Sequence, residues 1–178
     1  SMFGGLNSLF IILCAPILAY AWTWLAKKNL EPSTPAKFAF GIIQAGLGFG
    51  ALVLGAQLAG EDGKVAMIWL VLAYFIHTTG ELCLSPVGLS AVTKLSISRV
   101  VGVSMGTWFL AIALSETLAS RLGKMAAIST ADQADASSAS ALATYTQLYE
   151  FLMWTGLIAG VVLLIITPLL KKGMHGIK

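Results

Sequence analysis

The sequence predicts an all-α integral membrane protein with five transmembrane helices. Hydrophobic residues make up 57% of the 178 residues and charged residues only 11%, a balance that a soluble domain of this length would not need. Five apolar runs are each long enough, at about 1.5 Å per helical residue, to cross the roughly 30 Å hydrocarbon core of a bilayer. The predicted spans are residues 6–26, 36–58, 66–93, 100–122 and 147–170.

The first predicted span ends in an aromatic and basic cluster. Trp22 and Trp24 come just before Lys27 and Lys28, a pattern typical of a helix that leaves the hydrocarbon through the interface. A proline-containing turn at residues 31–35 leads into the second span. Glycines recur there and later at a spacing of four, and we expect these pairs to let helices pack closely, without chemistry of their own. The pairs are Gly46/Gly50, Gly102/Gly106 and Gly156/Gly160.

The third predicted span places polar side chains inside an apolar run. Glu81 lies deep within it, and an ionised carboxylate at the centre of a membrane helix costs about 2.5–3.5 kcal/mol on insertion scales. Such an acid indicates a functional site that supplies a cation, a proton or a polar ligand. His77 precedes Glu81 by four residues and Ser85 follows it by four, so we expect the three side chains to stack on one face and line a polar cavity.

Pro86 predicts a kink close to Glu81. Proline supplies no N–H to the carbonyl of Leu82, and its ring crowds that turn of the helix. Irregular backbone at membrane depth is tolerated where it is buried in protein or lines a watery cavity, and transporters place substrate sites at interrupted helices. Pro86 and His77 are therefore candidates for gating or coupling. Glu116, an acid within the fourth span, is a third candidate.

The distribution of charge predicts a loop and an orientation. Residues 123–146 are rich in Ala, Ser and Asp without periodicity, which predicts a solvated loop. If the C-terminal tail is cytoplasmic, alternation places eight lysines and arginines on that side and three outside, loop 123–146 included. The N-terminus then faces outside, from which we expect further helices upstream. Short loops favour a bacterial inner membrane.

Several classes of function are disfavoured by the composition. The net charge of +3 is small and dispersed, and no basic run is interleaved with aromatics, so nucleic acid is not an expected partner. Cys14 and Cys83 lie in apolar runs without metal-ligand spacing, and we expect no metal site. An intramembrane enzyme would need paired acids, a Ser/His pair or metal ligands at one depth, and only His77 with Glu81 comes close. We therefore expect no catalytic residues.

Three stretches resemble one family of transporters. Residues 81–95, ELCLSPVGLSAVTKL, resemble the tenth-helix signature of the proton-dependent oligopeptide transporter (POT) family of the major facilitator superfamily. Residues 32–39, PSTPAKFA, resemble the family's entry to helix nine, and residues 102–111, GVSMGTWFLA, resemble its helix eleven. The resemblance implies that the five spans are helices eight to twelve of a twelve-helix fold. The N-terminal bundle and the first helix of the C-terminal bundle would then lie outside this chain.

The resemblance also implies a function and a set of site residues. In that family two bundles rock about a central site for a di- or tripeptide, and uptake is coupled to protons, with no other cofactor. By position, Asn7 and Glu81 would hold the peptide amino terminus, Ser85 would line the pocket, and Trp108 would stand beside the ligand side chain. The chemistry agrees, because an ammonium group in a low-dielectric cavity favours a carboxylate and a neutral acceptor. An indole adds an apolar wall and a cation–π face.

Two alternatives remain open at this point. A transporter of the same fold could carry another small solute, such as nitrate. Alternatively, the chain could be a membrane assembly module without transport activity, docking through its small-residue pairs. Tolerance of Glu81→Gln, together with loss of association when Gly102 or Gly106 is enlarged, would be the mark of the assembly module.

Overall fold

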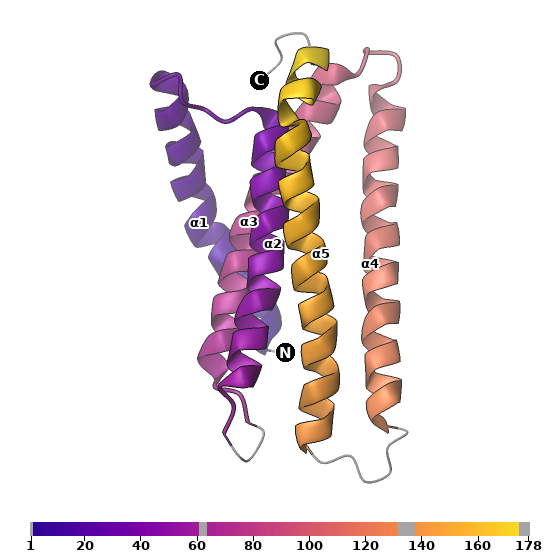
Figure 1. The fold of residues 1–178 in the computed structure, drawn as a ribbon. Coiled ribbons are helices and arrows are strands. Elements are labelled where there is room, and N and C mark those ends of the chain that lie inside the picture. Colours follow the sequence, from indigo (N-terminus) through magenta and orange to yellow (C-terminus); the bar gives the residue numbers. More distant parts are fainter. Residues whose placement is uncertain (1, 61–63, 132–137, 175–178) are drawn as a thin grey trace.

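The computed structural model describes residues 2–60, 64–131 and 138–174, and the chain folds into five long helices (Figure 1). Consecutive helices run antiparallel, and each is long and apolar enough to cross a membrane. The predicted fold class is therefore confirmed. The helices are α1 (Met2–Lys27), α2 (Thr34–Gln57), α3 (Met67–Leu95), α4 (Val101–Ala131) and α5 (Ser138–Gly173).

The expected loop at residues 123–146 is wrong at both of its ends. α4 continues to Ala131, and α5 already begins at Ser138. Both extensions contain several alanines, the strongest helix formers, and a helix that leaves the hydrocarbon still satisfies its backbone hydrogen bonds internally. The loss of apolar character therefore marks the edge of the membrane and not the end of the helix. The middle of the expected loop, residues 132–137, lies outside the described residues.

Small residues set the distance between α2 and its two main partners, α3 and α5. A Cβ built on Gly41 of α2 would lie 2.8 Å from the carbonyl oxygen of Gly80 in α3. One built on Gly156 of α5 would lie 2.9 Å from the Cα of Gly46. Such close approach of backbones replaces the hydrophobic drive that lipid does not supply. The prediction that the glycine pairs of α2 and α5 bring helices together is confirmed.

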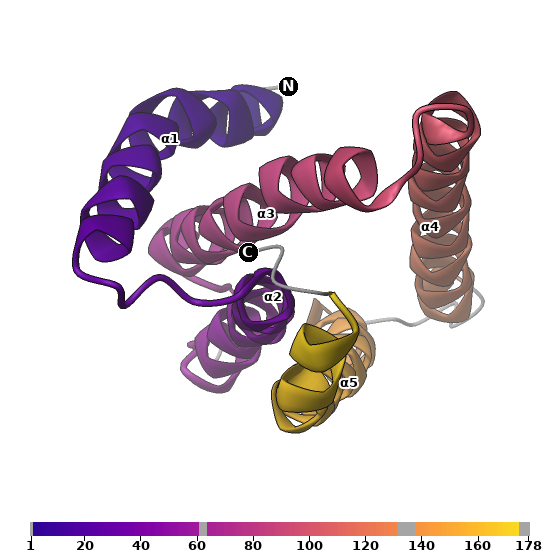
Figure 2. The same ribbon diagram turned by 90° about the horizontal axis from the view of Figure 1, so that it is seen from above.

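The third glycine pair behaves differently. A Cβ built on Gly102 or Gly106 of α4 would meet no atom of the described chain within 4 Å. α4 makes few contacts with α3 and α5, and its ribbon stands apart from that of α2 in the view from above (Figure 2). The expected packing role of this pair is therefore not fulfilled within the described residues.

α1 packs against the side of α3 away from α2 (Figure 2). Phe10 of α1 meets Phe75 of α3 edge to face, with ring centroids 5.5 Å apart. A second attachment follows the end of α1, where Glu31 in the connection pairs with Lys37 in the first turns of α2. Lys37 is only 8% exposed, and its ammonium lies 5.0 Å from the ring centroid of Trp22. α1 is thus held at two separate places.

Candidate functional site

Glu81 and Ser85 form an exposed strip on α3, the open strip. The helix continues without interruption through Pro86, and the side chains of Glu81, Ser85 and Pro86 are all exposed. Their neighbours Gly80 and Cys83 are buried. Among the described residues, Glu81 has neither an ion-pair nor a hydrogen-bond partner; their ion pair joins Glu31 and Lys37, elsewhere in the chain. The acid is therefore free to receive a ligand or a proton.

Ser85 lies one turn beyond Glu81 on the same strip. A serine in a membrane helix commonly donates a hydrogen bond back to the carbonyl four residues earlier, and several threonines of this chain do so, Thr107 among them. The Ser85 hydroxyl makes no such bond within the described part of the chain. Ser85 can therefore offer its hydroxyl to a group bound beside Glu81.

Asn7 reaches α3 one turn before Glu81. Its Oδ1 accepts a hydrogen bond from Thr78 Oγ1 at 2.7 Å, and Thr78 is 1% exposed. Thr78 precedes Glu81 by three residues, so the bond places Asn7 about one helical turn from Glu81 along α3. Sequence reasoning missed Thr78. Its signal was a hydroxyl three residues before the acid, able to partner a half-buried amide of a neighbouring helix.

Trp108 lies against α3 two turns beyond Glu81. Its indole rests on Gly88, and the Phe38 ring of α2 meets it edge to face, with centroids 6.2 Å apart and planes at 81°. These three residues border a mostly apolar groove of about 560 Å³ between α3, α4 and the start of α2. Neither Glu81 nor Ser85 lines that groove. The structure thus places the indole of Trp108, a residue of α4, against α3 about two turns beyond Glu81.

His77 points away from the open strip. Its Nε2 lies 3.0 Å from the carbonyl oxygen of Ala45 in α2, and its ring meets Phe49 edge to face at 4.7 Å. Gly48 of α2 leaves the room that the ring occupies. The expected stack of His77, Glu81 and Ser85 on one face is therefore wrong for His77, because Gly48 makes room for the imidazole against α2 and the Ala45 carbonyl gives its Nε2 a partner.

Glu116 lies on an exposed face of α4. It shares a shallow polar hollow with Thr117, Ser120, Arg121 and Lys124, all from the same helix. This polar strip extends toward the end of α4 that leaves the membrane. The structure does not bring Glu116 together with Glu81, and its role in gating or coupling stays a prediction.

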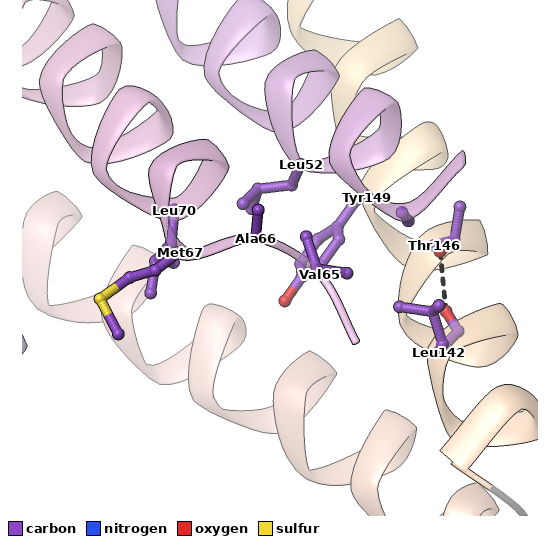
Figure 3. Close-up of a pocket in the computed structure, with 9 residues that line it drawn as sticks. Leu52, Val65, Ala66, Met67, Leu70, Leu142, Thr146 and Tyr149 are labelled. Atoms are coloured by element: carbon purple, nitrogen blue, oxygen red, sulfur yellow. Dashed lines mark hydrogen bonds between the residues drawn. The ribbon is translucent and has the colours of Figure 1, made fainter. Parts of the chain in front are cut away.

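A separate cavity of about 320 Å³ lies where α2 ends and where α3 and α5 begin (Figure 3). Leucine, valine, alanine and methionine side chains form most of its wall. Thr146 and Tyr149 are its hydroxyl-bearing residues, and Thr146 Oγ1 already donates to the Leu142 carbonyl at 2.7 Å. None of the predicted site residues lines it. In the described parts of the chain, no group of three His, Cys, Asp or Glu side chains could hold a metal.

The sequence matches the POT family model, PTR2, over residues 1–145. It is 43% identical over 123 residues to the peptide transporter YePEPT of Yersinia enterocolitica, covering 68% of this chain and 24% of that protein. It is 34% identical over 171 residues to dipeptide and tripeptide permease B of Aliivibrio fischeri, covering 96% of this chain and 34% of that protein. The chain thus spans about a quarter to a third of these relatives.

Solved structures give the same result. A peptide transporter POT in complex with sulfate is 37% identical with a TM-score of 0.65, covering 92% of this chain and 30% of that one. A POT family transporter in complex with a thioalcohol conjugated peptide is 29% identical with a TM-score of 0.73, at the same coverage. The five helices correspond to part of a major facilitator fold, as the resemblance implied. The chain belongs to the POT family of membrane transporters.

Proposed function

We propose that this chain forms part of a transporter that takes up di- and tripeptides together with protons. The observation that carries the proposal is Glu81, an exposed carboxylate that lies in the middle of a membrane-spanning helix and has no partner among the described residues. A charge in this position is costly unless a proton or a cation neutralises it. The ammonium group of a peptide and a proton are the two partners that peptide uptake would bring to it. The relatives named as peptide transporters and permeases support this substrate class.

The chain would supply the half of the site that receives the peptide amino terminus. Glu81 would pair with the ammonium group, and Asn7, positioned by Thr78, would add a neutral oxygen nearby. Ser85 would offer a hydroxyl one turn further along α3, and Trp108 would form a wall for a side chain. The peptide carboxylate would be held by residues of another helix bundle, which alternating access requires.

Proton coupling would act through the same carboxylate. A protonated Glu81 loses its attraction for the ammonium group, so proton binding and peptide binding at this residue would alternate. Pro86, beside this strip, would help the cytoplasmic half of α3 to move, and Glu116 and His77 are further candidates for gating or coupling. The basic ends of α1, α3 and α5 lie at the same end of the bundle (Figure 1), which fits a cytoplasmic C-terminus in a bacterial inner membrane.

Uptake by the complete polypeptide in proteoliposomes tests the proposal. With an inward proton gradient, we expect uptake of a labelled dipeptide, and we expect Glu81→Gln to abolish gradient-driven uptake. Glu150→Gln, at a half-buried acid of α5, is the matched control and should leave uptake largely intact. A wild-type protein that is folded but carries only another solute, such as nitrate, would contradict the peptide assignment.

The assembly module remains a second candidate because of one observation. Gly102 and Gly106 form a small-residue pair on α4 that meets nothing within 4 Å in the described chain. If docking were the function, Gly102→Leu would abolish association with partner helices while Glu81→Gln would have no effect. Loss of uptake in Glu81→Gln with association retained would decide for transport.

A further inference from the structure

The indole of Trp108 packs against α3 at Gly88, a residue without a side chain. A Cβ on Gly88 would fall within the space of the indole, 2.7 Å from Trp108 Cζ2 and also 2.7 Å from Phe38 Cζ. Both distances are shorter than atoms in contact normally show. The indole therefore lies directly on the backbone of α3 and can do so because residue 88 is glycine.

Phe38 fixes the ring from a second direction. Its edge-to-face contact with Trp108 has the geometry that aromatic pairs prefer and that contributes about 0.5–1.5 kcal/mol beyond burial. Three helices thus meet at one point, with Phe38 from α2, Gly88 from α3 and Trp108 from α4. Among the described residues, Trp108 is the α4 side chain that makes an aromatic contact with α2.

We propose that Gly88 and Phe38 form a seat for the Trp108 indole and that Gly88 thereby determines which peptide side chains the transporter accepts. This inference rests on the proposed function, in which Trp108 is a wall of the side-chain pocket. The depth of the seat sets how far the indole stands off α3. A methyl group at residue 88 pushes the indole away from α3 and into the space that a ligand side chain would occupy.

The expected effect follows from the size of the change. Discrimination by one methylene group in an apolar pocket amounts to roughly 10–200-fold. In Gly88→Ala we expect KM for a dipeptide with a bulky side chain, such as Phe-Ala, to rise by about tenfold relative to Ala-Ala. A smaller ring relieves the crowding, so adding Trp108→Phe to Gly88→Ala restores much of the ratio.

The position of the indole can be measured without transport. The complete protein is labelled with 5-fluorotryptophan, and the Trp108 signal is assigned as the fluorine resonance that disappears in Trp108→Phe. We expect Gly88→Ala to shift that resonance. Gly41→Ala is the matched control, since it also forces a methyl group between α2 and α3 but lies against Leu84 and Gly80 and not against the indole. It should leave both the resonance and the KM ratio unchanged.

A second variant tests the seat if Gly88→Ala does not fold. Phe38→Leu removes the edge-to-face contact without adding bulk, so the Trp108 resonance should shift or broaden. An unmoved resonance in Gly88→Ala, or in Phe38→Leu where that is the folded variant, would overturn the seat. A moved resonance with an unchanged KM ratio would overturn the specificity role. If the variants shift the resonance but the folded wild type takes up no peptide, the seat is retained and the specificity role is overturned along with the proposed function.

Discussion

At the scale of single residues, the site is defined by which polar groups have partners and which do not. Glu81 and Ser85 are exposed and unpaired in the described chain, whereas Asn7 is engaged by Thr78. Glu81 could be identified from the sequence because an acid in an apolar run is conspicuous. The Asn7–Thr78 pairing could not, because it joins residues 71 positions apart whose meeting depends on how α1 packs on α3.

The hydrogen bond between Asn7 and Thr78 gives a prediction at this scale. Thr78→Val keeps the shape of the side chain but leaves the Asn7 amide without its donor. We expect a loss of about 0.5–1.5 kcal/mol in the free energy of unfolding, in the range of hydrogen bonds between membrane helices. Thr79→Val is the control: among the described residues Thr79 bonds to the Ile76 carbonyl of its own helix, as Thr78 also does to Tyr74, but it makes no bond to α1. Equal losses in the two variants, measured by unfolding in mixed micelles, would contradict the pairing.

At the scale of the helices, apolar length was the reliable signal. All five spans were predicted because a bilayer requires a continuous apolar run, and the helices cover those runs to within one residue at each end. The C-terminal end of α4 and the N-terminal end of α5 were not predicted, since alanine-rich polar sequence is compatible with both loop and helix. The orientation of His77 was also missed. Helical spacing puts it near Glu81, but the space beside Gly48 and the carbonyl of Ala45, which hold its ring, belong to α2.

The Glu31–Lys37 pair gives a prediction about how α1 and α2 are joined. Removing one partner of a buried pair leaves the other charge poorly solvated, which costs about 3–5 kcal/mol when both are fully buried. The Glu31 side chain is 27% exposed, so Lys37→Met should lower the free energy of unfolding by less, about 1–3 kcal/mol. The double variant Glu31→Gln with Lys37→Met should recover part of the loss. Lys28→Met, at an exposed lysine over Trp24, is the control.

At the scale of the whole molecule, the proposed mechanism needs a second helix bundle facing the open strip of α3. Alternating access moves two bundles around a shared site, and this chain spans about a quarter to a third of its relatives. We therefore expect the five helices, produced alone and reconstituted, to show no gradient-driven peptide uptake. The complete polypeptide in the same vesicles is the positive control. Uptake by the 178-residue chain alone would contradict a mechanism that needs two bundles.

The close contact between Gly46 and Gly156 has a consequence for biogenesis. The two glycines belong to α2 and α5, and roughly a hundred residues of translation separate their emergence from the ribosome. At synthesis rates of about 5–20 residues per second, the Gly46 face of α2 would wait on the order of 5–20 s in lipid before its partner arrives. α3 emerges from the ribosome much sooner than α5. An early α2–α3 hairpin would therefore be the intermediate whose exposed α2 face the insertion machinery has to protect.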